Sequence, residues 1–211
     1  MNYSLILSNN HRSYTYIKYF IKKKAIPNNV IYIDDEKKIN LKKKIFNFLN
    51  SLKYTKIYCF RSDNIDKKKI VKTVLSIKDK YFVYSGYSGV IIKNKKILKK
   101  KLFLHSHTGK LPEYQGSTTI YYSILREKKI YCTTFAMNSF IDKGRVLLVK
   151  EYHIPKNIKK LDFYDNEIRA INILHVLNKI KFKKLIFFKK KVRFYSPYYI
   201  IHPILRYLVC K

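Results

Sequence analysis

The chain has 211 residues, with 46 Lys and Arg against 13 Asp and Glu, which gives a formal net charge of +33. Hydrophobic residues make up 47% of it and aromatic residues 16%, which excludes intrinsic disorder because disordered chains are poor in both. Only five Gly and five Pro exclude collagen-like and flexible-linker chains. The length suits a single domain over residues 1–211, with a basic, aromatic C-terminal extension over 181–211 docked on it.

The positive charge comes almost entirely from lysine. Seven of the 46 cationic residues are Arg, the residue preferred for bidentate recognition of phosphates and bases. Lys, Asn, Ile, Tyr and Phe are abundant together, as A/T-rich codons produce in any protein. The composition therefore favours drift over a dedicated nucleic-acid surface, and a non-catalytic basic RNA-binding module is kept as the alternative of another class.

Cysteine usage and the N-terminus predict a compartment. Cys59, Cys132 and Cys210 are far apart and form no CxxC pair, which argues against a disulfide framework and for a reducing compartment. The N-terminus has no charged leader followed by an apolar core, and no stretch approaches the roughly 18 apolar residues of a membrane span. We expect a cytoplasmic protein without a membrane partner, and a homodimer is left open.

Short apolar runs alternate with amphipathic ones over the first hundred residues. Apolar residues recur at helical spacing between the runs, as at Ile17, Phe20 and Ile21. This alternation predicts a Rossmann-like α/β fold, a mainly parallel twisted sheet with helices on both faces, whose ligands bind beyond the carboxyl ends of its strands. The strands are predicted at Tyr3–Leu7, Val30–Ile33, Lys56–Phe60 and Tyr81–Tyr84.

The second half of the chain does not show this regular alternation of strands and helices. A buried strand, Leu102–Leu104, runs into His105 and is followed by a turn-rich segment that ends at Gly116. Ser117 is a plausible N-cap for a helix through Arg126. Further on, the patterns predict strands at Ile130–Ala136 and Arg145–Tyr152, a helix over Asp165–Ile180, and a docked strand or short helix over Tyr198–Val209.

Two histidines and one aspartate suggest chemistry. His105 and His107 end a buried strand, where alternation places residues two apart on the same face. Asp142 lies in a turn after another strand and can reach them only through the tertiary fold. A carboxylate beside an imidazole fixes its tautomer and favours its protonated form, which can donate to a developing oxyanion. The alternative for each is a packing role, and no metal site is predicted because no ligand-spaced pair occurs.

The run from Leu104 to Gly116, LHSHTGKLPEYQG, together with Ile141–Gly144, resembles the 10-formyltetrahydrofolate-dependent formyltransferase family. That family includes sugar N-formyltransferases, methionyl-tRNA formyltransferase and glycinamide ribonucleotide formyltransferase. Its signature is Asn-x-His, then Leu-Pro and an aromatic residue shortly before Gly, with Asp-x-Gly further on. Here Asp142 follows His107 by 35 positions, and the resemblance covers roughly residues 81–152.

The resemblance implies the site residues. His107 and Asp142 match the catalytic pair, and His105 stands where the family usually has Asn, a role that imidazole can fill with a tautomer or pH requirement. The formyl donor, 10-formyltetrahydrofolate, is expected at Gly86, Tyr87, Ser88, Gly89, Val90, Ile91, Ser139, Phe140 and Ile141. The acceptor is expected at Gly109, Tyr114, Gly116, His11 and Arg12.

The resemblance implies transfer of a formyl group to an amine. Tyr121 and Tyr122, beside hydroxyl residues, suit a sugar or a base, so a small anionic acceptor, a nucleotide-linked amino sugar, is the first choice. The alternatives are glycinamide ribonucleotide, although Ser8–Arg12 has no glycine to hold its phosphate, and methionyl-tRNA. Enzymes acting on that tRNA carry a C-terminal β-barrel, for which the residues after Tyr152 are too few.

Overall fold

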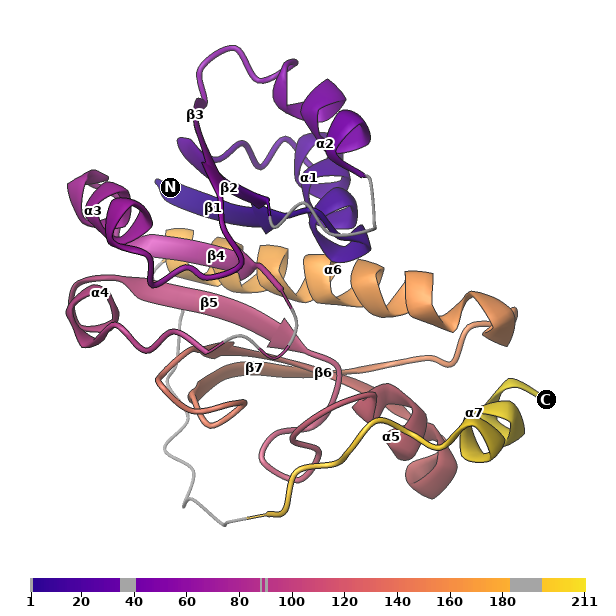
Figure 1. Cartoon of the computed structure of the whole chain (residues 1–211). Coiled ribbons are helices and arrows are strands. Elements are labelled where there is room, and N and C mark those ends of the chain that lie inside the picture. The colour runs from indigo at the N-terminus through magenta and orange to yellow at the C-terminus, as the bar shows by residue number, and fades with distance from the viewer. Residues whose placement is uncertain (1, 35–40, 88, 90, 183–194) are drawn as a thin grey trace. The chain divides into compact units, whose positions relative to one another are not determined.

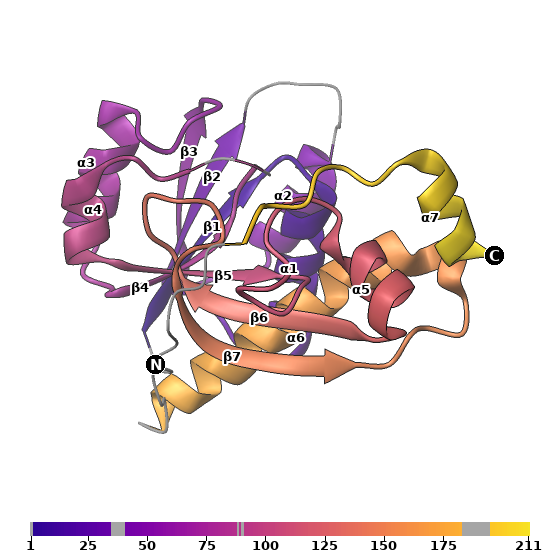
Figure 2. The ribbon, with the colours of Figure 1, turned by 90° about the horizontal axis from the view of Figure 1, so that it is seen from below.

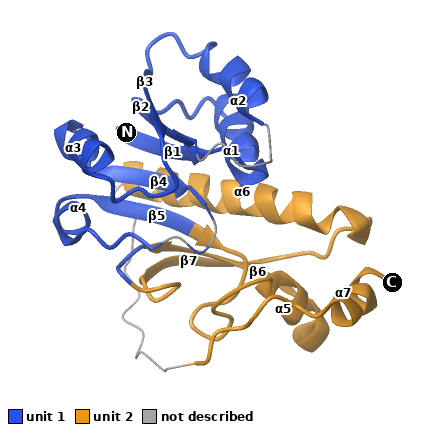
Figure 3. Cartoon of the chain, viewed as in Figure 1, with its two compact units in different colours: residues 1–105, 137–139 blue, residues 106–136, 140–211 orange. Residues whose placement is uncertain are grey.

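The computed structural model describes residues 2–34, 41–87, 89, 91–182 and 195–211. They form two compact units (Figure 3). Unit 1 comprises Met1–His105 with Met137–Ser139, and unit 2 comprises Ser106–Ala136 with Phe140–Lys211. The strands follow the order β3 (Lys56–Arg61), β2 (Asn29–Asp34), β1 (Tyr3–Ser8), β4 (Tyr81–Ser85), β5 (Leu102–His107), β6 (Ile130–Ala136) and β7 (Arg145–Tyr152).

Unit 1 carries the parallel part of the sheet. Its strands are β1 (Tyr3–Ser8), β2 (Asn29–Asp34), β3 (Lys56–Arg61), β4 (Tyr81–Ser85) and the first part of β5 (Leu102–His107). β1 pairs in parallel with both β2 and β4, β2 with β3, and β4 with β5. The four predicted strands Tyr3–Leu7, Val30–Ile33, Lys56–Phe60 and Tyr81–Tyr84 are confirmed to within one residue at each end, and β5 extends three residues beyond the predicted Leu104. Uninterrupted apolar runs specify the central strands because these are covered on both faces.

Helices cover both faces of the unit 1 strands (Figure 1). They are α1 (His11–Lys22), α2 (Lys42–Leu49), α3 (Lys68–Ser76) and α4 (Lys95–Lys100). Tyr32 meets Phe46 of α2 with ring centroids 5.1 Å apart, while its neighbour Ile31 shares a core cluster with Ile70 and Val74 of α3. Because side chains alternate along a strand, these contacts place α2 and α3 on opposite faces. The predicted fold class is confirmed.

Unit 2 is built on an antiparallel hairpin (Figure 2). Its elements are α5 (Thr119–Glu127), β6 (Ile130–Ala136), β7 (Arg145–Tyr152), the short 3₁₀ helix η1 (Ile158–Lys160), α6 (Leu161–Lys181) and α7 (Pro203–Cys210). β6 and β7 pair along their whole length. Ile124, Ile130, Ile168 and Ile201 share one core cluster, which joins α5, β6, α6 and the segment before α7.

Three details differ from the sequence predictions. Ser117 is not the N-cap of α5: the helix begins after Thr118, which has a φ of 52° and makes no side-chain cap. The amide of Ser117 instead donates to the Tyr198 carbonyl at 2.8 Å. Helix α4 was not predicted because six residues show too little periodicity, and α6 begins at Leu161, before the predicted Asp165.

The C-terminal segment combines both predicted forms. Tyr198 makes a single parallel β-bridge with Gly116, and the helix α7 follows. Residues 183–194 of the predicted extension lie outside the described residues. Among the helices that the structure describes, none is long and apolar enough to cross a membrane.

Candidate active site

His107 and Asp142 meet within unit 2. His107 ends β5, and Asp142 lies in the turn between β6 and β7. The imidazole Nδ1 lies 3.6 Å from the carboxylate Oδ2, and the two side chains are 5% and 11% exposed. The fold thus brings together two residues 35 positions apart, as the resemblance implies.

The other nitrogen of His107 is fixed by two oxygens. Nε2 lies 2.6 Å from the carbonyl oxygen of Tyr114, a group that can only accept, so Nε2 must carry a hydrogen. It also lies 3.0 Å from the hydroxyl oxygen of Thr119, whose own hydrogen is donated to the Thr108 carbonyl. Neutral His107 is therefore the Nε2–H tautomer, and its Nδ1 lone pair faces Asp142.

This arrangement prepares the pair to accept a proton. Burial lowers the pKa of His107, Asp142 raises it in part, and the Arg169 guanidinium lowers it further. The net direction is downward, so the ring is neutral near pH 7, and the expectation that Asp142 keeps His107 protonated is wrong because burial outweighs the carboxylate. A lone pair facing a carboxylate is unfavourable until a proton lies between them, and a proton that arrives at Nδ1 forms an ion pair with Asp142.

The turn of Asp142 is held in a restricted conformation. Asp142 has a φ of 51°, in the left-handed region that Asp tolerates better than most residues. Its Oδ2 accepts a hydrogen bond of 3.0 Å from the amide of Gly116. At Gly144 a Cβ would lie 2.0 Å from the carbonyl oxygen of Ala136, so only glycine fits.

A partly buried arginine supports the end of β5. Arg169 of α6 donates to Asp165 at 2.8 Å, to the Ser106 carbonyl at 2.7 Å and to the Thr108 hydroxyl at 2.6 Å. The Thr108 hydroxyl in turn donates to Asp165. Sequence reasoning missed this group. The available signal was an Asp–Arg pair at positions i and i+4 beside Ile168, on the buried face of a predicted helix.

The acceptor residues predicted in unit 2 contact the His107–Asp142 pair, Gly109 and Tyr114 at His107 and Gly116 at Asp142. At Gly109 a Cβ would lie 2.8 Å from the His107 Nε2 and 2.6 Å from the Tyr114 carbonyl oxygen, so the loop passes close to the ring only because this residue is glycine. The buried Tyr114 donates its phenol to Glu127 at 2.5 Å. Its phenol thus points to the protein, and substrate binding by Gly109, Tyr114 and Gly116 stays a prediction.

His105 belongs to unit 1. Its Nδ1 lies 2.9 Å from the Tyr84 carbonyl oxygen, so Nδ1 is the protonated nitrogen of the neutral ring. Donation from Nε2 to an oxyanion then needs a second proton on His105. An Asn amide at this position has no such requirement, so this departure from the family's pattern carries a chemical cost.

The predicted donor loop and His11–Arg12 lie in unit 1. Arg12 and Asn10 both donate to the Gly86 carbonyl, which has its two lone pairs engaged, while Tyr87 donates to the Ile33 carbonyl at 3.2 Å. His11 is exposed at the start of α1. The Gly86 oxygen is therefore already hydrogen-bonded within the protein, and folate recognition by this loop stays a prediction, as does acceptor binding by His11 and Arg12.

The rest of the predicted donor site divides between the two units. Gly89, which has a φ of 74°, and Ile91 belong to unit 1, as does Ser139. Phe140 and Ile141 belong to unit 2, where their side chains are 63% and 48% exposed. Ser88 and Val90 lie outside the described residues.

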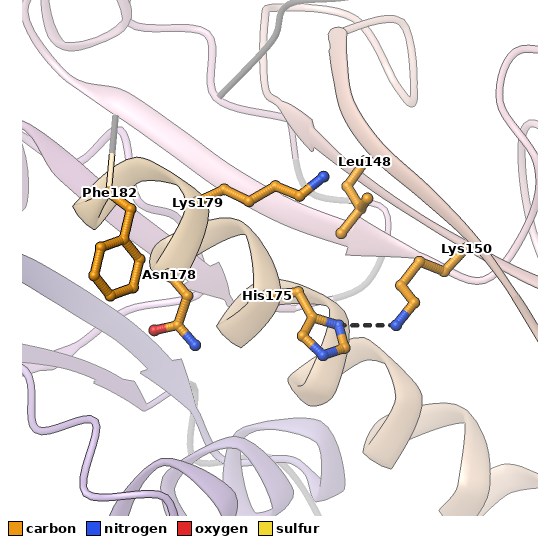
Figure 4. Close-up of a pocket in the computed structure, with 6 residues that line it drawn as sticks. All are labelled: Leu148, Lys150, His175, Asn178, Lys179 and Phe182. Carbon is orange, nitrogen blue, oxygen red and sulfur yellow. Dashed lines mark hydrogen bonds between the residues drawn. The ribbon is translucent and has the colours of Figure 1, made fainter. Parts of the chain in front are cut away.

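A pocket of about 380 Å³ lies away from His107, between β7 and the end of α6 (Figure 4). Lys150, His175 and Lys179 line it together with Leu148, Asn178 and Phe182, and the Lys150 amine lies 3.2 Å from the His175 Nδ1. In unit 1, a pocket of about 260 Å³ is bounded by Phe60–Ser62 and Lys67–Ile70. Neither contains a residue predicted for the site.

Comparison with known proteins agrees with the fold. The structure of glycinamide ribonucleotide transformylase 1 from Symbiobacterium toebii superposes with a TM-score of 0.66 and 12% identity, over 93% of this chain and 94% of that one. A sugar N-formyltransferase from a Shewanella species gives 0.61 and 18%, over 94% and 76%. The chain has the formyltransferase fold.

In sequence, the formyltransferase relation extends to a curated protein. Methionyl-tRNA formyltransferase of Orientia tsutsugamushi (strain Boryong) is 26% identical over 132 residues, which cover 57% of this chain and 42% of that protein. The chain therefore matches less than half the length of this relative. No family model matches the sequence.

Proposed function

We propose that the protein transfers a formyl group from 10-formyltetrahydrofolate to the amine of an acceptor. The observation that carries the proposal is the state of His107, whose Nε2–H is fixed by the Tyr114 carbonyl while its Nδ1 faces Asp142 at 3.6 Å. An imidazole held in one tautomer beside a carboxylate can accept a proton at a defined atom and return it. Formyl transfer to an amine needs such a proton shuttle.

The reaction proceeds by addition and elimination. The acceptor nitrogen attacks the formyl carbon, and the resulting tetrahedral intermediate carries an oxyanion and a proton to be lost from the attacking nitrogen. His107 takes that proton at Nδ1, where Asp142 stabilises it, and gives it to the folate nitrogen as the bond from that nitrogen to carbon breaks. Protonated His105 donates to the oxyanion, a contribution worth about 3–4 kcal/mol for donors of this kind.

Two acceptors are proposed, and different observations bear on them. The nucleotide-linked amino sugar rested on Tyr121 and Tyr122, but Tyr121 is 4% exposed and donates to Asp162, while Tyr122 packs on Tyr198 with ring centroids 4.5 Å apart. Methionyl-tRNA is supported by the curated relative. These observations prefer neither acceptor, and the two are distinguished by assay.

Release of tetrahydrofolate with each acceptor tests the proposal. The panel comprises methionyl-tRNA, a nucleotide-linked amino sugar and glycinamide ribonucleotide, and a reaction without acceptor measures hydrolysis of the donor. His107→Ala and Asp142→Asn are expected to lower turnover by about 10³-fold or more while the fold persists. His153→Ala and Asp63→Asn, which change the same residue types at exposed positions, are the matched controls.

Near-normal turnover of either His107→Ala or Asp142→Asn at saturating donor contradicts the assigned roles. Binding of RNA that weakens steeply with salt and ignores sequence, without any formyl transfer, favours instead a non-catalytic basic RNA-binding module.

A further inference from the structure

The loop before α5 supplies one backbone contact to each member of the His107–Asp142 pair. We call residues 108–118 the active-site loop. Its Tyr114 carbonyl accepts from the His107 Nε2 at 2.6 Å, and its Gly116 amide donates to the Asp142 Oδ2 at 3.0 Å. Because both contacts come from the backbone, the position of this loop determines the tautomer of His107 and the orientation of the Asp142 carboxylate.

The C-terminal tail, residues 195–211, holds this loop from outside. The Tyr198 amide donates to the Gln115 carbonyl and the Ser117 amide donates to the Tyr198 carbonyl, each at 2.8 Å. The two hydrogen bonds lie on either side of Gly116. Figure 2 shows the tail, in yellow, running beside the segment that precedes α5. The tail thus adds one residue of β-pairing at the point where the loop contacts Asp142.

The residue type at position 116 also supports the pairing between the tail and the active-site loop. Gly116 has a φ of 103°, and a Cβ there would lie 2.3 Å from the Tyr198 carbonyl oxygen and 2.7 Å from its nitrogen. Any side chain would force Tyr198 away from the loop. The sequence therefore leaves room at position 116 for the tail.

The Tyr198 side chain adds contacts of its own. Its ring stacks on Tyr114 with centroids 5.5 Å apart and an interplanar angle of 15°, and its hydroxyl accepts from Arg126 at 2.5 Å. Beyond Tyr198, the buried Ile201 donates its amide to the Thr118 hydroxyl at 2.8 Å. The tail is thus fixed to the rest of unit 2 at two positions, at Tyr198 through its side chain and at Ile201 through its backbone amide.

We propose that the C-terminal tail, through Tyr198, is a positioning element for the catalytic pair: it holds the active-site loop so that Tyr114 sets the tautomer of His107 and Gly116 orients Asp142. The expected effect on kcat rests on the proposed function, whereas the expected effect on the tautomer of His107 does not. Tyr198 is a positioning residue, since its contacts are with the loop and not with the reacting atoms.

Tyr198→Pro removes the amide that donates to Gln115 and tests the proposal directly. We expect kcat to fall about 10²-fold, as a displacement of about 1 Å at a catalytic group produces, with KM for the formyl donor nearly unchanged. Tyr199→Ala, one position on and 83% exposed, is the matched control. Tyr198→Phe keeps the stacking ring and the backbone contacts, and is expected to retain most of the rate.

A second measurement does not depend on turnover. In the full-length protein labelled with ¹⁵N-histidine, His107 is expected to give the signals of a neutral Nε2–H ring. Tyr198→Pro is expected to mix the two tautomers and move the His107 titration towards that of free histidine. If Tyr198→Pro does not fold, Tyr198→Ala, which removes the ring and keeps the backbone, is expected to cause the same changes to a smaller degree.

The outcomes separate the two proposals. Unchanged kcat and unchanged His107 signals in a folded Tyr198 variant, with only a lower melting temperature, would overturn the positioning role. A wild-type protein that transfers no formyl group, but whose His107 tautomer responds to Tyr198→Pro, would overturn the proposed function and leave the positioning role standing.

Discussion

The middles of the strands differ between the two units. In unit 1, the central residues of β1, Leu5–Leu7, are fully buried and apolar. In unit 2, Thr133 and Thr134 occupy the middle of β6, and Asn172 in the middle of α6 donates to the Thr134 hydroxyl at 3.0 Å. The middle of β1 is thus apolar, whereas the middle of β6 belongs to a buried polar network beside the candidate site. The contrast shows that these two strands are held in place by different interactions, apolar packing for β1 and hydrogen bonds between side chains for β6.

Removing a core ring is expected to have the largest effect on stability. Phe82 of β4 is completely buried and packs against Phe103 with centroids 5.4 Å apart. Phe82→Ala is expected to lower the free energy of unfolding by about 3–5 kcal/mol, because it removes apolar contacts and leaves a cavity. Urea titration measures the change, with Tyr54→Ala, at a site 94% exposed, as the control. A loss below about 1 kcal/mol would contradict the apolar core described for unit 1.

Breaking the polar network of unit 2 is expected to cost slightly less. Arg169→Ala leaves Asp165 largely buried without its partner and is expected to cost about 3 kcal/mol of unfolding free energy. The exposed pair Arg206–Asp162 offers a comparison, since Arg206→Ala is expected to cost under about 1 kcal/mol. Equal losses in the two variants would show that burial does not distinguish the pairs.

Acid is expected to weaken unit 2 through its histidines. Burial lowers the pKa of both His107 and His175, so the unfolded chain binds protons that the folded chain does not. Stability is therefore full above about pH 6.5, the ordinary value for histidine, and falls below it by up to about 1.4 kcal/mol per pH unit for the buried His107. The contribution of His175 is smaller, because this side chain is partly exposed and solvent screens its charge. Urea titrations at several pH values measure this slope. His107→Gln and His175→Gln should each reduce it, and an unchanged slope in both would contradict the cause.

The smallest effect is expected at His105. His105→Asn supplies an amide donor that needs no extra proton. We therefore expect kcat of the variant to fall less than that of the wild type as the pH is raised, and to stay within about tenfold of the wild-type value. A pH profile of kcat measures this. An identical profile in both proteins would show that the protonation of His105 does not limit the reaction.

The same contrast explains how much could be predicted from sequence. The strands of unit 1 follow from apolar periodicity, and His107 and Asp142 were found because a motif carried them. The helix start at Thr119, the Arg169 contacts and the pairing of Tyr198 with the loop were not found. Each of these features depends on a contact between residues far apart in sequence, such as the hydrogen bond from Arg169 to the Ser106 carbonyl. A local sequence pattern does not specify such a contact.

The packing of Tyr122 on Tyr198 has a practical consequence, because the chain contains no tryptophan. A single indole introduced by Tyr122→Trp would fluoresce without background at the place where the tail meets the rest of unit 2. Its emission would move to longer wavelength whenever the tail detaches, which gives a direct optical record of that step in real time.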